Sequence, residues 1–256
     1  MLRKPRVDYD EIAHLYDAQP YRAREPDAEL PAFAGERLDL AILDIGCGTG
    51  NQLIANRTAL PQAWCVGLDR SIGMLRQARR KARQIAWLQA DGAALPYAAG
   101  SFDFVCSQFA FHHIGDKAGM LREVFCVLRP GGKFVLHNSC PHQSGDWLYY
   151  EYFPEARIVD LQDFWPPDAI VEAMNVAGFV NVEAVYRHVH WEQDLPAWLG
   201  IVKRRDTCSQ LQTISDSAYE AGVDRLQREI TDPRMPRSRQ DHLCLVTIRG
   251  RAPDAR

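Results

Sequence analysis

The sequence has no long apolar run. A membrane-spanning helix needs about 18 consecutive apolar residues, and no stretch of this 256-residue chain is apolar over that length. The first residues also lack the apolar core of a secretory signal peptide. We therefore expect a cytoplasmic protein that does not span a membrane.

The chain also has little net charge. Its 30 basic and 33 acidic residues give a net charge of -3. Such a balance creates no overall field that would attract nucleic acid or an anionic membrane. We expect neither as a partner, and the sequence does not indicate an oligomeric state.

The seven cysteines lack the C-x-x-C spacing of zinc and redox sites. Their number is odd, and most of them lie in apolar surroundings, where cysteine packs as a small hydrophobic residue. We predict reduced cysteines and no metal site.

The strongest motif is LAILDIGCGTG, from Leu40 to Gly50. A short apolar run, typical of a buried strand, leads into three glycines at alternate positions: Gly46, Gly48 and Gly50. Glycine permits positive φ and lets a ligand lie directly on the backbone. The segment after the glycines is expected to be a helix with its positive end toward that ligand.

The details of this loop indicate which ligand it suits. The loop has no Lys-Ser/Thr pair for a nucleotide triphosphate, and its G-x-G-x-G spacing differs from the nicotinamide pattern. Asp44, two positions before the first glycine, would repel phosphates but attract an ammonium group. An amino acid joined to a nucleoside fits both the carboxylate and the helix N-terminus.

Four further motifs follow in order: VGLDRSIGML, LQADGAALPYAAGSFDFV, FAFHHI and LREVFCVLRPGGKFVLH. Together with DIGCGTG they resemble the class I S-adenosylmethionine-dependent methyltransferases of the ubiquinone/menaquinone-biosynthesis type (methyltransferase type 11). The resemblance covers roughly residues 40–137. It implies S-adenosyl-L-methionine as cofactor and methyl transfer to a small-molecule acceptor at an undetermined O, N or C atom.

The resemblance and the loop together predict twelve cofactor-binding residues: Arg24, Asp44, Gly46, Cys47, Gly48, Gly50, Asp69, Arg70, Met74, Asp91, Gly92 and Phe109. Asp69 ends the second apolar strand 19 residues after Gly50, where a carboxylate can accept from both ribose hydroxyls. The resemblance implies that Asp91 accepts from the adenine amino group. The alternatives are a helix cap at Asp69, an Asx turn at Asp91 and a core role for Met74.

The leader, residues 1–36, is expected to fold over the cofactor as a helical cap, as it does in the resembled family. DYDEIAHLYDA predicts a short amphipathic helix. Tyr16, Tyr21, Arg22 and Arg24 are candidates to touch the methionine end or the acceptor. The alternative is that the arginines are solvated on a surface helix.

His112 and His113 follow the fourth predicted strand, at the sheet edge that also carries the glycine loop. We predict that one of them is a general base or orients the acceptor, because imidazole takes up a proton near neutral pH. The alternative is an inert, hydrogen-bonded pair. His137 is a further candidate base.

Alternating strands and helices predict an α/β fold. We expect a Rossmann-like, doubly wound, mostly parallel seven-stranded sheet with an antiparallel edge strand, an N-terminal helical cap and a C-terminal helical insertion. One domain over 1–256 would comprise a cap (1–36), a cofactor-binding core (37–138) and acceptor-side and lid elements (139–256). The aromatic interval 147–165 either walls an acceptor pocket or packs the last helices.

Two other functions stay open at this point. One is a non-catalytic S-adenosylmethionine-binding partner of another subunit, because binding residues alone would look the same. The other is a nicotinamide-dependent oxidoreductase, which leaves Asp44 unexplained.

Overall fold

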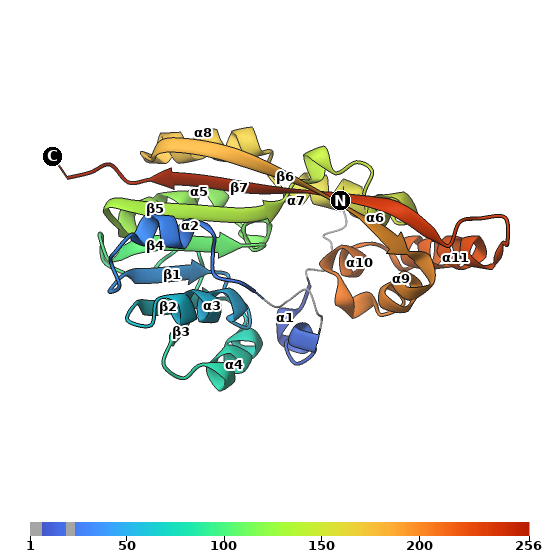
Figure 1. Cartoon of the computed structure of the whole chain (residues 1–256), viewed down its shortest axis with the longest axis horizontal. Helices are drawn as coiled ribbons and strands as arrows, with labels where there is room; N and C mark the ends of the chain where they lie inside the picture. Colours follow the sequence, from blue (N-terminus) through green and yellow to red (C-terminus); the bar gives the residue numbers. More distant parts are fainter. Residues whose placement is uncertain (1–6, 19–23, 256) are drawn as a thin grey trace. The chain divides into compact units, whose positions relative to one another are not determined.

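A computed structural model describes residues 7–18 and 24–255 (Figure 1). Its central feature is a seven-stranded sheet in the order β3-β2-β1-β4-β5-β7-β6. The strands are β1 (Ala41–Ile45), β2 (Trp64–Asp69), β3 (Ala86–Gln89), β4 (Phe102–Gln108), β5 (Leu128–Ser139), β6 (Val180–Asp194) and β7 (Ser238–Arg251).

The strands from β3 to β5 are parallel. β1 pairs with β2 on one side and with β4 on the other, so the strand order reverses at β1. Ligands of such sheets bind beyond the carboxyl ends of the strands at this reversal. β7 runs against its neighbours (Figure 1), which confirms the predicted Rossmann-like sheet with antiparallel pairing at its edge.

Contacts divide the chain into two compact units, which are described separately. The larger unit comprises Tyr9–Asn138, Pro167–Val185 and Val246–Arg256, and the smaller one Met1–Asp8, Ser139–Pro166 and Tyr186–Leu245. The expected single domain stays a prediction.

The larger unit holds the parallel strands and the helices between them. These helices are α1 (Tyr9–Ile12), η1 (Tyr16–Ala18), α2 (Glu29–Ala34), α3 (Asn51–Ala59), α4 (Ile72–Lys81), η3 (Phe111–His113), α5 (Lys117–Val127) and α8 (Pro167–Ala177). All five residues of β1 are buried. Ser71 caps α4 by accepting from the Met74 amide, and three basic residues in its last turn complement the helix dipole.

The leader forms less helix than its sequence pattern predicts. α1 ends at Ile12, and a separate 3₁₀ turn, η1, follows at Tyr16. Helices this short are marginal without tertiary support. In this segment the support comes from side-chain hydrogen bonds of Asp10 and Asp17 to other elements.

The smaller unit contains the remaining helices: η4 (Pro141–Gln143), α6 (Leu148–Tyr152), α7 (Pro154–Asp163), α9 (Leu195–Val202), η5 (Arg205–Thr207), α10 (Ser209–Thr213) and α11 (Asp216–Thr231). Aromatic rings of the predicted interval form its core. Trp198 of α9 packs edge-on against Tyr149, Tyr152 and Phe153, with ring centroids 5.2 to 6.5 Å apart. Most of this interval therefore packs helices together, as one of the two interpretations anticipated.

Candidate cofactor site and family

The glycine loop joins β1 to α3 in the larger unit. Gly46, Gly48 and Gly50 have φ of 73°, 54° and 81°. A Cβ on Gly46 would lie 2.2 Å from Ala110 Cβ, and one on Gly50 would strike Trp87. A Cβ on Gly48 would meet nothing within 4 Å. Packing therefore requires the outer two glycines, whereas Gly48 offers bare backbone to a ligand.

Asp44 lies directly before this loop with its side chain buried. Among the residues that the structure describes, its Oδ1 has no hydrogen-bond partner. Burial, followed by the nearby charges of Asp69 and Asp27, raises the pKa of Asp44 to about 7. A buried carboxylate oxygen without a donor is costly, so it is well suited to a cationic ligand group.

Asp69 ends β2 beside the loop. Its two carboxylate oxygens accept from the amides of Gly48, at 2.7 Å, and Ser71, at 2.8 Å. Burial raises the pKa of Asp69, and these amides partly offset the effect. Each oxygen retains a second lone pair, so both can still accept from ligand hydroxyls. Arg70 is exposed, and its carbonyl accepts from Gln89.

Other residues of the predicted set have visible packing or turn roles. Cys47 belongs to the hydrophobic core, and Met74 is also buried. Asp91 accepts from the Ala93 amide at 3.0 Å, which is an Asx turn. A Cβ on Gly92 would lie 2.8 Å from a methyl of Ile45, so this position requires glycine for packing. Their contacts with the cofactor stay predictions.

Phe109 and Arg24 lie together beyond the end of β4. Phe109 has a φ of 52°, which is uncommon for a residue with a side chain, and such strain clusters at functional sites. The guanidinium carbon of Arg24 is 5.6 Å from the centre of the Phe109 ring. The leader and the end of β4 therefore meet at this point.

His112 and His113 have different surroundings, although their ring centres are only 3.9 Å apart. Burial, with the neighbouring His113 and Lys117, lowers the pKa of His112 well below its ordinary value, so this imidazole is neutral at pH 7. His113 is exposed, and its Nε2 lies 2.7 Å from the Tyr9 hydroxyl. His113 therefore combines exposure to solvent with a second proton-carrying group, the Tyr9 hydroxyl.

His137 has both ring nitrogens engaged within the larger unit. Nε2 lies 2.9 Å from Asp27 and Nδ1 lies 2.9 Å from the Thr247 hydroxyl. This chain ties the segment before α2 to two strands. We therefore keep only the adjacent pair as candidate bases.

The structure adds leader residues that sequence analysis missed. The Asp10 carboxylate accepts from the Ser71 hydroxyl and the Gly73 amide, each at 2.6 Å. Asp17 accepts from the Thr49 hydroxyl at 2.6 Å. The sequence did contain a hint of these contacts. The leader is acidic, and the N-termini of helices such as α3 and α4 attract carboxylates.

Of the remaining leader candidates, the structure describes Tyr16 but not Tyr21 or Arg22. The ring of Tyr16 packs edge-on against that of Tyr9, with centroids 6.4 Å apart. Tyr21 and Arg22 lie outside the described residues. Their proposed contacts with the cofactor stay predictions.

Among residues 7–18 and 24–255, no group of three or more histidine, cysteine or acidic side chains is arranged to hold a metal ion. Within the same residues, no helix is both long and apolar enough to cross a membrane.

Comparisons with known proteins agree with this geometry. A family model described as a methyltransferase domain matches residues 42–132. A demethylmenaquinone methyltransferase of Thermus thermophilus is 32% identical over 174 residues, covering 57% of this chain and 77% of that protein. The Lactococcus lactis enzyme of that name is 36% identical over 174 residues, covering 58% and 69%.

A solved structure supports the fold. An Anabaena variabilis protein assigned as a methyltransferase of an antibiotic biosynthesis pathway aligns with a TM-score of 0.70 at 21% identity, over 88% of this chain and 98% of that one. The Asp44 oxygen and the bare backbone at Gly48 fit the ammonium group and the chain of S-adenosylmethionine. The chain therefore belongs to the class I S-adenosylmethionine-dependent methyltransferases of the ubiquinone/menaquinone type, which methylate small molecules.

Proposed function

We propose that this enzyme methylates a ring carbon of a hydroxylated aromatic acceptor of the quinol type. The relatives from Thermus thermophilus and Lactococcus lactis are named for demethylmenaquinone, whose reduced form has this chemistry. The observation that carries the proposal is the exposed His113–Tyr9 pair at the end of β4, because a phenolic acceptor has a proton to give up.

On the donor side, Asp44 would pair with the ammonium group of the methionine end. The bare backbone at Gly48 would hold the chain of the cofactor, and Asp69 would accept from the ribose hydroxyls. Asp91 and Gly92 would bind the adenine, and Arg24, which lies over the Phe109 ring, would cover the methionine end. These roles make the binding of the donor depend on three carboxylates.

The bound cofactor supplies an electrophilic methyl group on a sulfonium. The protein must align the acceptor with that group and exclude water, and alignment alone can lower a barrier by ~7 to 11 kcal/mol. No nucleophilic side chain is required.

The His113–Tyr9 pair handles the acceptor proton. The Tyr9 hydroxyl passes its proton to His113 Nε2 while it takes the proton of the acceptor hydroxyl. The resulting phenolate would push electrons to the ring carbon, which would take the methyl group as the carbon–sulfur bond breaks and its electron pair stays on sulfur. The ring carbon would then lose its hydrogen as a proton, which restores the aromatic ring. Neutral His112 lies beside His113 and adds no positive charge that would disfavour the protonated His113.

Turnover with a reduced naphthoquinone lacking the ring methyl tests the acceptor. We expect S-adenosylhomocysteine and a ring-methylated product, identified by mass spectrometry. Formation of a methyl ether, or turnover only with amines, would overturn the quinol carbon as the target.

Substitutions test the proposed residues separately. His113→Ala should lower kcat by roughly 100-fold and leave cofactor affinity unchanged, because a base acts only in the chemical step. His14→Ala, at an exposed histidine, is the control. Wild-type turnover in both His112→Ala and His113→Ala would remove the pair from the mechanism.

The ribose role of Asp69 has its own test. Asp69→Ala should weaken S-adenosylmethionine binding by more than ~1 kcal/mol in calorimetry, because two hydroxyls lose a charged acceptor. Glu220→Ala, on the exposed side of α11, should change nothing. Equal affinity in the Asp69 variant would contradict this role.

A further inference from the structure

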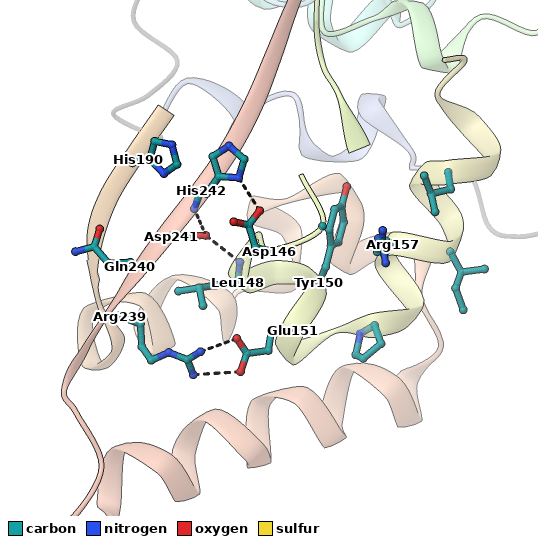
Figure 2. A pocket seen from close by; sticks show the side chains of 14 residues that line it. Asp146, Leu148, Tyr150, Glu151, Arg157, His190, Arg239, Gln240, Asp241 and His242 are labelled. Atoms are coloured by element: carbon teal, nitrogen blue, oxygen red, sulfur yellow. Dashed lines mark hydrogen bonds and ion pairs between the residues drawn. The ribbon is translucent and has the colours of Figure 1, made fainter. Parts of the chain in front are cut away.

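The smaller unit contains a cavity that the methyl-transfer site does not use. It measures about 650 Å³, within the usual range of small-molecule sites. α6 and α7 form one wall, and β6 and β7 form the other (Figure 2). We call it the α7 cavity; its lining includes Asp146, Tyr150, Arg157, Ile158, His190 and His242.

The part of the lining that α7 contributes is apolar apart from one arginine. Ile158 and Leu161 line the cavity, yet these residues are 59% and 37% exposed. Arg157 and Leu161 are four residues apart on α7 and therefore lie on the same face of the helix. This wall thus presents a positive charge next to hydrocarbon that is not covered by protein.

The acidic groups of the lining already have donors. Asp146 lies 2.6 Å from Nδ1 of His242, and Glu151 holds Arg239 through two contacts of 2.7 and 3.1 Å (Figure 2). Buried Asp241 accepts from the backbone amides of Leu148 and His242, at 2.9 and 2.8 Å. None of these carboxylates requires a ligand cation.

His242 is held at the centre of the strand wall. Its Nε2 lies 2.8 Å from Nδ1 of His188, and the His190 ring stacks on it with centroids 4.5 Å apart. A hydrogen bond from His242 holds the pKa of Asp146 below its usual range. This side of the cavity is therefore a fixed array of hydrogen bonds.

Three polar side chains of the lining differ from these groups in their hydrogen bonding. Within the described part of the chain, Arg157, His190 and Gln240 make no side-chain hydrogen bond or ion pair, although His190 stacks on His242. Arginine is a permanent cation with donors only, and imidazole and carboxamide can both donate. The uncommitted groups thus favour a ligand with a negatively charged, acceptor-rich end.

We propose that the α7 cavity binds a small amphipathic anion. Its carboxylate or phosphate group pairs with Arg157, within reach of His190 and Gln240, and its hydrocarbon body covers Ile158 and Leu161. The arginine fixes the end at which the anionic group lies, because it is the one cation of the lining without an acidic partner among the described residues. This site is distinct from the glycine loop and does not depend on the proposed acceptor.

Calorimetry on the full-length protein tests the ligand class. Octanoate, octyl phosphate and octylammonium are titrated separately, below their micelle concentrations. We expect both anions to bind and the cation not to bind, and the tighter anion identifies the preferred head group. Absence of binding by both anions at millimolar concentration, or equal binding of octylammonium, overturns the proposal.

Substitutions locate the binding. Arg157→Gln and Ile158→Asp should each weaken octanoate binding at least roughly tenfold, because a charge-assisted contact or the apolar cover is lost. Arg187→Gln removes an exposed arginine of β6 outside the lining and is the matched control. Unchanged affinity in Arg157→Gln overturns the proposal.

A second titration verifies that the variants are folded. S-adenosylmethionine affinity should be equal in all of these variants, since the three substituted side chains are exposed and lie in the smaller unit. Failure of S-adenosylmethionine to bind wild-type protein would count against the donor site alone.

Discussion

We propose that a single buried carboxylate, Asp44, links the fold to the cofactor. Its pKa of about 7 lies well above the ordinary 3.8 because it is buried near two other acids. An ammonium group beside it stabilises the carboxylate and lowers that pKa in the complex. Below pH 7, ligand binding must therefore release a proton.

This linkage predicts the pH dependence of binding. Affinity for S-adenosylhomocysteine, which carries the same ammonium group, should fall roughly tenfold between about pH 7.5 and about pH 6 and be level above about pH 8. Calorimetry across this range measures it. Asp44→Asn should bind more weakly and lose most of the slope; an unchanged slope would assign the proton to another group.

The same substitution should stabilise the free protein. The folded-state pKa of Asp44 exceeds its unfolded value, so its ionisation destabilises the fold; this penalty is absent below pH 4 and grows up to pH 7. Asp44→Asn should raise the free energy of unfolding at pH 8 by at most about 4 kcal/mol. Urea unfolding at pH 8 and pH 5 should show that gain shrinking in acid; a gain independent of pH would contradict it.

Sequence reasoning succeeds at residues whose constraint is local. The loop glycines were predictable because a strand-to-helix turn with positive φ needs them within a few positions. Asp10, Asp17 and Tyr9 were missed, because their partners are 32 to 104 positions away and only the folded chain brings them together.

At the scale of elements, the leader is fastened to the cofactor loop by its acidic side chains. Asp17 binds Thr49 and Asn51 at the start of α3 and Lys81 at the end of α4. Burial would raise the pKa of Asp17, but the hydrogen bonds from Lys81 and Thr49 outweigh it and hold the pKa below its usual value. The attachment is thus present above pH 4 and weakens in stronger acid.

Loss of this attachment should free the cofactor. Asp17→Ala should raise the dissociation rate of S-adenosylmethionine roughly tenfold, because one carboxylate holds the leader to both helices. Stopped-flow displacement measures the rate. Asp224→Ala, on α11, is the control of equal charge change; an unchanged rate in Asp17→Ala would show that the leader does not retain the cofactor.

The order of elements was more predictable than their extents. Alternating apolar runs and breakers predicted each of the seven strands, and the pattern is strongest in the buried parallel strands. The leader helix was predicted too long, since its turns are decided by the partners of Asp10 and Asp17 rather than by its own periodicity. The α7 cavity was not predictable, because its lining comes from three segments that are far apart in the sequence: residues 145–161, His190 and residues 239–242.

On the scale of the whole molecule, the family, fold, cofactor and enzymatic class predicted from sequence are confirmed, and the oxidoreductase and non-catalytic alternatives are not favoured. The two proposed ligand sites lie in different compact units. Every predicted cofactor residue belongs to the larger unit, and the whole lining of the α7 cavity belongs to the smaller one. Binding of S-adenosylhomocysteine and of octanoate should therefore protect different segments of the chain.

Hydrogen exchange with each ligand tests this division. Saturating S-adenosylhomocysteine should slow exchange at amides that open locally in residues 46–50 and 69–74, because binding stabilises the closed form by mass action, by ~2.7 kcal/mol at a hundredfold excess over Kd. Octanoate should instead protect α6 and α7. Amides that exchange only through global unfolding will exchange more slowly with either ligand. The comparison therefore uses the amides that exchange quickly through local opening. Protection of the glycine loop by octanoate, absent in Arg157→Gln, would mean that the α7 cavity communicates with the donor site.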